Sequence, residues 1–191
     1  MNLPNQLTLL RIALSFLLIL CLLSPGVVLK GAAVLVFTLA SLTDLWDGRL
    51  ARRRGWVTDF GILMDPIADK ILVLSAFLSF VQLNVAPVWM VVLIATREFL
   101  VTGLRLFALG KGQVLPAEAA GKHKTVSQMV AISITLLFLL AREAVAVESG
   151  AARWVTLGEM GIWWLMLLTV ILTLVSGISF FWKHRRIILN L

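Results

Sequence analysis

Six long apolar segments dominate this sequence and leave few folds open to it. A helix needs about 20 apolar residues to cross the hydrocarbon core of a bilayer, and the segments are close to that length. They are residues 7–23, 31–50, 61–83, 85–107, 125–141 and 160–182. The 191-residue chain is 60% hydrophobic and only 14% charged, which exceeds what a soluble core requires. The sequence therefore predicts an all-α polytopic membrane protein, with six transmembrane helices in a single domain spanning residues 1–191.

The basic residues predict how these helices are oriented. Lysine and arginine near membrane segments are retained in the cytoplasm. If the N-terminus lies inside, all of the 17 basic residues except Lys30, Arg142 and Arg153 fall on or near the cytoplasmic side. Six crossings then place both termini in the cytoplasm. The net charge of +7 is accounted for by an anionic inner leaflet, so no nucleic-acid partner is expected.

The cysteine and the histidines argue against thiolate or imidazole chemistry. Cys21 is the only cysteine and lies within an apolar segment, which excludes an internal disulfide. His123 and His184 each stand among basic residues. We expect both on a solvated surface rather than on a metal, because metal ligands come in clusters.

Two acids lie where the second apolar segment ends, in the string TDLWDGRLARRRG of residues 43–55. One helical face would carry the residues at positions i, i+3, i+4, i+7 and i+8 from the first acid. These residues are Asp44, Asp47, Gly48, Ala51 and Arg52. The glycine and the alanine permit close approach of a neighbouring helix.

The third segment carries a second acidic face, in GILMDPIADK. Gly61, Asp65 and Asp69 follow at steps of four and share one face if the helix begins near Thr58. Pro66 would then remove one backbone hydrogen bond and could kink the helix. Alternatively, Asp65 caps a helix that starts at Pro66, which keeps the two acids close but removes Gly61 from the face. Consecutive antiparallel helices would bring all four acids together at the cytoplasmic boundary.

Four carboxylates at close range need positive charge between them, because like charges repel and intramembrane charges are costly. A salt-bridge network with Arg49, Arg52 and Lys70 would supply it. Divalent cations would also supply it, and carboxylates without histidine or cysteine favour Mg²⁺ or Mn²⁺ over zinc. We favour the metal, because four acids on two facing stripes exceed what packing requires. The arginines could then hold an anion such as phosphate.

Carboxylate-bound metal beside guanidinium groups is typical of phosphoryl transfer, and the membrane location predicts a lipid substrate. The string from Asp44 to Asp69, DLWDGRLARRRGWVTDFGILMDPIAD, matches the pattern D-x2-D-G-x2-A-R-x8-G-x3-D-x3-D at every fixed position. It resembles the signature of the CDP-alcohol phosphatidyltransferases.

This resemblance implies a homodimeric six-helix membrane enzyme with that family's fold and a cytoplasm-facing site. It implies two bound Mg²⁺ or Mn²⁺ ions held by Asp44, Asp47 and Asp65, with Asp69 as the catalytic base and a further metal contact. It also implies a nucleotide pocket. The residues assigned to that pocket are Asn5, Thr8, Gly48, Ala51 and Arg52.

Two looser strings are similar to the bacterial family members that use sn-glycerol 3-phosphate. They are NLPNQLTLLRI near the start and TREFLVTGLRLFALGKGQVLPAEAAGKHKTVSQM in the fourth and fifth segments. The similarity implies transfer of a phosphatidyl group from CDP-diacylglycerol to sn-glycerol 3-phosphate, with release of CMP, in bacterial inner-membrane phospholipid biosynthesis.

A phosphorylated acceptor also suits the basic residues of these two segments. Arg97 and Arg105 are two helical turns apart, and a buried arginine is costly without an anion. Lys122 and Lys124, at the start of the fifth helix, could complete a phosphate pocket. Two alternatives stay open: the arginines pair with Glu98 or with the acids above, and the lysines serve only as membrane anchors.

Two further functions remain possible at this point. The same chemistry could use another acceptor, such as inositol phosphate, serine or phosphatidylglycerol. A transporter for divalent cations would also explain the carboxylates. It would not explain the neighbouring arginines, because guanidinium groups repel a cation.

Overall fold

The structure is a computed structural model of the chain. It describes the backbone of residues 3–54, 59–112, 119–145 and 152–189, and the side chains of residues 6–43, 64–112, 124–145 and 153–185. The described residues form six α-helices. These are α1 (Leu3–Leu23), α2 (Val27–Arg54), α3 (Asp59–Gln82), α4 (Val88–Gly110), α5 (Ala119–Val145) and α6 (Ala152–Leu189).

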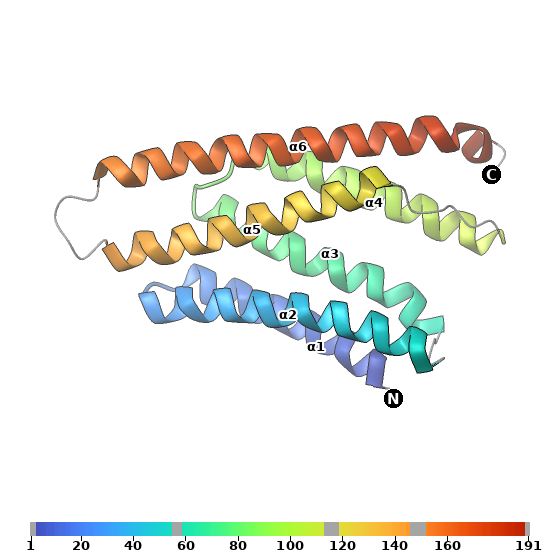
Figure 1. Cartoon of the computed structure of the whole chain (residues 1–191), viewed down its shortest axis with the longest axis horizontal. Coiled ribbons are helices and arrows are strands. Elements are labelled where there is room, and N and C mark those ends of the chain that lie inside the picture. Colours follow the sequence, from blue (N-terminus) through green and yellow to red (C-terminus); the bar gives the residue numbers. More distant parts are fainter. Residues whose placement is uncertain (1–2, 55–58, 113–118, 146–151, 190–191) are drawn as a thin grey trace.

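The six helices run side by side along the long axis of the molecule (Figure 1). α1 packs along both α2 and α3, and α6 packs along α4 and α5. Both termini lie at one end of the bundle, where α2 ends and α3 begins. We call this the termini end. It is the end at which the sequence places its acidic motif.

Three helices contain stretches long and apolar enough to cross a membrane, within the residues described. The stretches are Gln6–Leu23, Lys124–Val145 and Arg153–Arg185, and a shorter apolar stretch covers Val27–Thr43 of α2. In α4, the charged residues Arg97, Glu98 and Arg105 interrupt the apolar sequence. The polytopic membrane protein is thus supported, with three clear spans of the six expected.

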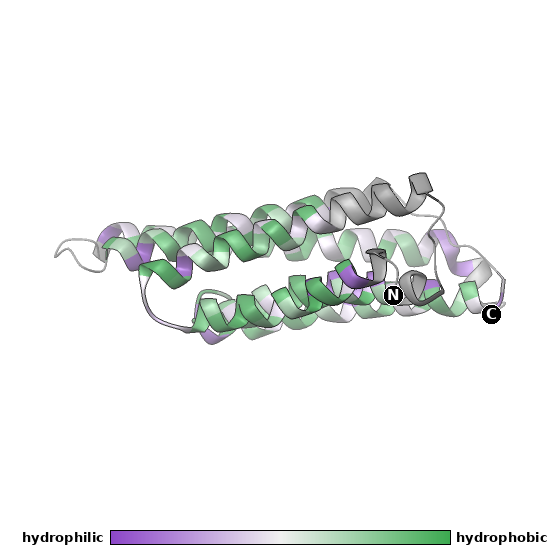
Figure 2. Ribbon diagram, turned by 90° about the horizontal axis from the view of Figure 1, so that it is seen from below, coloured by the Kyte–Doolittle hydropathy of each residue, from purple (hydrophilic) through white to green (hydrophobic). Residues whose placement is uncertain are grey.

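The outer surface of the bundle is apolar, as expected of helices that face lipid. Large side chains such as Phe16, Leu35, Trp164 and Ile178 are more than half exposed. Hydrophobic residues continue along the middle of the helices, whereas hydrophilic ones gather toward the ends (Figure 2). A soluble monomer rarely exposes so much contiguous apolar surface.

Several helices extend beyond the apolar segments from which they were predicted. α2 continues through the arginines to Arg54, and α6 begins at Ala152 instead of residue 160. Charge ends an apolar segment but not a helix, because arginine is a good helix former. α4 begins at Val88 instead of residue 85. Pro87 precedes it in an extended conformation, and the residue before a proline is disfavoured in a helix.

α3 decides between the two predicted starts of the third helix. It begins at Asp59 and contains Pro66 within it. The start near Thr58 is therefore confirmed to within one residue, and a helix that starts at Pro66 is wrong. Asp65 and Asp69 lie one turn apart on this continuous helix.

The interior contains a large apolar core together with buried polar side chains. The buried polar side chains include Thr8, Arg11 and Ser15 on α1, Glu98 on α4, Lys124, Gln128 and Thr135 on α5, and Thr169, Thr173, Ser176 and His184 on α6.

His184 corrects a sequence expectation. The residue is buried, and its Nδ1 lies 3.0 Å from the carbonyl oxygen of Phe180. The solvated position predicted for it is wrong, because this face of α6 turns toward the bundle. The side chain of His123 lies outside the described residues.

Gly158 provides a test of the packing between α5 and α6. A β-carbon added there would overlap the Phe138 ring, and that ring also packs edge-on against Trp154. Gly158→Ala is therefore expected to lower the free energy of unfolding by about 1–3 kcal/mol, the usual cost of overpacking. Thermal unfolding in detergent measures the change.

Gly161 supplies the matched control on the same helix, because a β-carbon there meets nothing within 4 Å. Gly161→Ala should leave stability unchanged or raise it slightly, since alanine favours a helix. Equal stability of the two variants would contradict the packing described for α5 and α6.

Candidate active site

The first contact at the termini end joins α1 to the acidic face of α3. The Thr8 hydroxyl donates a hydrogen bond to Asp65 Oδ1 at 2.5 Å. Thr8 is fully buried, and Asp65 is half-buried. α1 packs along α3, so this hydrogen bond fixes the Asp65 carboxylate at the helix interface. The structure thus places a predicted nucleotide-pocket residue against a predicted metal ligand.

Asp69, one turn further along α3, is paired with its neighbour. Lys70 Nζ lies 2.8 Å from Asp69 Oδ2 and 3.3 Å from Glu98 Oε2 of α4. The Asp69 side chain is 33% exposed, whereas that of Glu98 is 2% exposed. Asp69, at one end of this chain of ion pairs, is thus accessible, whereas Glu98, at the other end, is buried in the bundle. The Lys70–Asp69 pair confirms one member of the predicted salt-bridge network.

Glu98 is the centre of a buried cluster of charges. Its Oε1 pairs with Lys124 of α5 and lies 3.3 Å from Arg97 Nη1. Gln128 of α5 donates to the same oxygen at 3.3 Å. Three cations from three helices therefore surround a single buried carboxylate, which compensates the cost of burying it.

Arg97 and Arg105 both reach toward α6. Arg97 Nη2 donates to the Ser176 hydroxyl at 2.8 Å, and the guanidinium of Arg105 lies 5.1 Å from the centre of the Phe180 ring. Both side chains therefore lie on the face of α4 that packs against α6. The alternative that Arg97 pairs with Glu98 is confirmed as well. Their role toward an acceptor phosphate stays a prediction.

Several predicted site residues have side chains outside the described part of the chain. They are Asn5 on α1, Asp44, Asp47, Gly48, Ala51 and Arg52 on α2, and Lys122 on α5. Their backbones are helical. Those of α2 belong to its last turns, which lie at the termini end beside the start of α3 (Figure 1).

The described donors at this end suit a hard divalent cation. Asp65 and Asp69 offer carboxylate oxygens, which Mg²⁺ and Mn²⁺ prefer. A carboxylate that accepts one hydrogen bond can still bind a cation through its other oxygen. Among the described side chains no three His, Cys, Asp or Glu residues form a group able to hold a metal. Asp44 and Asp47 would have to complete the site.

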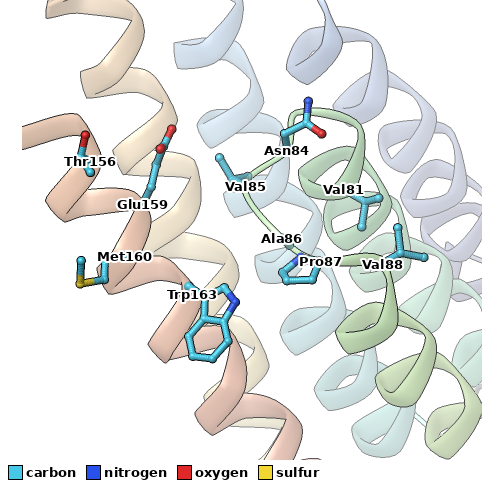
Figure 3. A pocket seen from close by; sticks show the side chains of 10 residues that line it. All are labelled: Val81, Asn84, Val85, Ala86, Pro87, Val88, Thr156, Glu159, Met160 and Trp163. Carbon is cyan, nitrogen blue, oxygen red and sulfur yellow. The ribbon is translucent and has the colours of Figure 1, made fainter. Parts of the chain in front are cut away.

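A cavity of about 600 Å³ lies at the opposite end of the bundle. It opens between the connection from α3 to α4 and the start of α6, with Asn84 and Pro87 across from Glu159 and Trp163 (Figure 3). Glu159, the carboxylate of this lining, pairs with Arg142 at 3.1 Å. The cavity lacks the group of acids found on α3, so the termini end is the better candidate site.

Comparisons with known proteins show the family of this chain. A family model described as CDP-alcohol phosphatidyltransferase matches residues 1–175. The chain belongs to this family. The matched range includes every predicted site residue, and CDP-alcohol phosphatidyltransferases generally use divalent metal ions. The acid-rich motif of α2 and α3 thus lies within a family to which its chemistry is suited.

Individual CDP-alcohol phosphatidyltransferases are similar over most of the chain. A CDP-diacylglycerol–glycerol-3-phosphate 3-phosphatidyltransferase of Bacillus subtilis is 40% identical over 96% of this chain and 95% of its own length. An enzyme of the same name from Rickettsia bellii is 37% identical over 94% of this chain and 93% of its own length. A probable phosphatidylglycerophosphate synthase of Mycobacterium tuberculosis is 45% identical over 71% of this chain and 66% of its own length.

The sequence did not assign a role to three residues of this family member. From the sequence, Glu98 is expected only as a partner for arginine, and neither Gln128 nor Ser176 stands out. The available signal was an acid within an apolar helix, which must have partners to be buried. Apart from Arg97, its partners come from two other helices, α3 and α5, so spacing along the chain could not identify them.

Proposed function

We propose that this protein is a phosphatidylglycerophosphate synthase. It transfers the phosphatidyl group of CDP-diacylglycerol to sn-glycerol 3-phosphate and releases CMP. The observation that carries this proposal is the similarity to the Bacillus subtilis enzyme over nearly the full length of both chains. Relatives that bear glycerol 3-phosphate in their names favour this acceptor over inositol phosphate, serine or phosphatidylglycerol. Family membership argues against a cation transporter.

Asp69 is the proposed base, because its side chain is accessible and stands on the acidic face of α3. A hydroxyl oxygen of glycerol 3-phosphate attacks the phosphorus that carries diacylglycerol. The bond from that phosphorus to the CMP oxygen breaks, CMP leaves with the bonding electrons, and the hydroxyl proton passes to Asp69. CMP is a good leaving group, so the protein mainly has to position the reactants and neutralise charge.

Asp44, Asp47, Asp65 and Asp69 would hold two Mg²⁺ or Mn²⁺ ions at the termini end. Bound metal offsets negative charge on the pyrophosphate of the substrate and on departing CMP. Thr8 supports the site by fixing Asp65 through its hydroxyl. The pocket for the cytidine nucleotide is proposed to consist of Asn5, Thr8, Gly48, Ala51 and Arg52.

The phosphate of the acceptor is proposed to bind the basic residues of α4 and α5. These are Arg97, Arg105, Lys122 and Lys124. Arg97 Nε is buried and has no hydrogen-bond partner among the described residues, so this guanidinium retains a donor for an anion. Another nitrogen of the same guanidinium, Nη2, donates to the Ser176 hydroxyl. Guanidinium and ammonium groups together suit a phosphate dianion.

We further propose six membrane crossings, with both termini and the site facing the cytoplasm of a bacterial inner membrane. The shortest helix has 21 residues, which spans about 30 Å at 1.5 Å per residue. Both termini lie at the same end of the bundle (Figure 1). The homodimer is a prediction from the family resemblance, and chemical cross-linking in native membranes would test it.

Purified protein tests the reaction directly. CMP release is measured with CDP-diacylglycerol and Mg²⁺, using separately glycerol 3-phosphate, inositol phosphate, serine and phosphatidylglycerol as acceptors. The proposal expects glycerol 3-phosphate to give the highest kcat/KM. A higher value with another acceptor would reassign the substrate. Metal uptake by protein-containing vesicles without CMP release would instead support a transporter.

Gly177 tests the assignment of Arg97 to the acceptor phosphate. A β-carbon at Gly177 would lie 2.9 Å from Arg97 Cγ, so we expect Gly177→Ala to shift the Arg97 side chain and to disturb its hydrogen bond with Ser176. We expect KM for glycerol 3-phosphate to rise about tenfold, the effect of losing one charged hydrogen bond, with KM for CDP-diacylglycerol unchanged. Gly161→Ala, which meets nothing within 4 Å on the same helix, is the control. Unchanged kinetics of Gly177→Ala would remove Arg97 from the acceptor site.

A further inference from the structure

We infer that Glu98 is a positioning residue. It holds the base Asp69 in place through Lys70, and it holds the proposed phosphate-binding cations Arg97 and Lys124 by direct contact. This inference rests on the proposed function. Glu98 itself lies inside the bundle and has no path to the reacting atoms in this arrangement, since its side chain is 2% exposed. Its effect must therefore pass through its partners.

The Glu98 carboxylate links the proposed base, Asp69, to the cations proposed to bind the acceptor phosphate. Lys70 Nζ bridges Asp69 Oδ2 at 2.8 Å and Glu98 Oε2 at 3.3 Å. The other oxygen, Oε1, accepts Lys124 and lies 3.3 Å from Arg97. Oε2 thus faces Lys70 and, through it, the proposed base. Oε1 faces Arg97 and Lys124, which are proposed to bind the acceptor phosphate.

The charge balance explains why such a link is needed. Lys70, Arg97 and Lys124 carry three positive charges, and mutual repulsion would drive them apart in a bundle of low dielectric. Glu98 attracts all three. It thereby keeps Lys124 and Arg97 close before an acceptor phosphate arrives, and it prevents Lys70 from turning wholly toward Asp69.

The surrounding contacts fix the Glu98 carboxylate itself. Gln128 donates to Oε1 at 3.3 Å, and the same amide lies 3.5 Å from the Thr173 hydroxyl. Arg97 is anchored to Ser176 on α6. Side chains of α3, α4 and α5 therefore meet at this acid, and α6 is joined to it through Gln128 and Arg97. An arrangement tied to four helices is rigid enough to set distances at a reaction centre.

Glu98→Gln and Glu98→Asp test the inference by steady-state CMP release. Glu98→Gln removes the charge and keeps the shape. Glu98→Asp keeps the charge and retracts the carboxylate by about 1.5 Å, one carbon–carbon bond. If Glu98 positions its partners, both variants lower kcat/KM for glycerol 3-phosphate by about 10- to 100-fold and leave KM for CDP-diacylglycerol unchanged. If it only balances charge, Glu98→Asp keeps wild-type kinetics, which would overturn the inference.

Lys70→Met and the double variant Glu98→Gln/Lys70→Met show whether Glu98 acts through Lys70. Action through Lys70 predicts that the two losses in kcat are clearly less than multiplicative, whereas independent sites would multiply. Multiplicative losses would overturn the link to Asp69. Glu159→Gln removes an ion-paired carboxylate at the opposite end and is expected to keep wild-type kinetics.

Folding and function are separated within the same experiment. Rates are divided by the amount of monodisperse protein, so a purely structural role of Glu98 would leave both KM values and the corrected kcat unchanged and would overturn the inference. Failure of the proposed function would give a different result: the wild-type protein itself would release no CMP with glycerol 3-phosphate. Active wild-type protein with unaltered Glu98 variants would refute the inference alone.

Discussion

Replacing Asp69 with asparagine is expected to lower kcat for CMP release by about 10³-fold, within the range that general-base catalysis contributes. Asparagine keeps the size of the side chain but cannot accept the hydroxyl proton, and it is a poorer ligand for a divalent cation. The residue is accessible and stands at the end of the α3 helical turn that also carries Asp65. Kinetics with saturating CDP-diacylglycerol and Mg²⁺ measure the effect.

The Asp69 variant should remain folded, because a one-third exposed side chain contributes little to packing. Its elution from size exclusion and its thermal unfolding are expected to match those of the wild type. Glu159→Gln, a second carboxylate-to-amide change at the far end of the bundle, should keep full activity. A near-normal rate for Asp69→Asn with Mg²⁺ present would show that another group is the base.

Removal of divalent metal is expected to abolish the reaction. After dialysis against EDTA, CMP release should fall by more than about a hundredfold, because metal ions contribute several kcal/mol of charge stabilisation in such transfers. Adding Mg²⁺ or Mn²⁺ in excess should restore it. Carboxylate ligands without thiolate or imidazole predict that Zn²⁺ restores much less.

The metal experiment separates the two sources of positive charge considered for the acidic motif. If arginine and lysine alone compensated the four acids, the EDTA-treated protein would keep its activity. The Lys70–Asp69 pair shows that one such bridge forms. It involves one of the acids, so it does not by itself compensate the other three.

The acidic face of α3 was predictable because the spacing of its residues reports directly on a helix. Asp65 and Asp69 follow at i and i+4, and the helix from Asp59 places them one turn apart. The start of α4 was missed by three residues, although Pro87 marked it. The apolar segment of α2 ends at residue 50, but the helical spacing of Ala51 and Arg52 already extends the helix to within two residues of its end at Arg54.

The buried polar contacts were less predictable, because they depend on which helices become neighbours. Glu98 meets Lys70 from α3 and Lys124 from α5, and no local spacing joins these residues. His184 is different. It lies at i+4 from Phe180 and i+8 from Ser176, both of them buried, so the inward face of α6 could have been extended to it from the sequence.

The most direct test of the central claim is Mn²⁺ binding by the purified protein, followed by electron paramagnetic resonance without any substrate. If the acids of α2 and α3 surround shared divalent ions, wild-type protein should bind about two Mn²⁺ per chain, the number used in two-metal sites. Asp65→Asn should lose at least one of them while it remains folded. Wild-type protein that binds no Mn²⁺, or an Asp65→Asn variant that binds it as well as the wild type, would contradict the account.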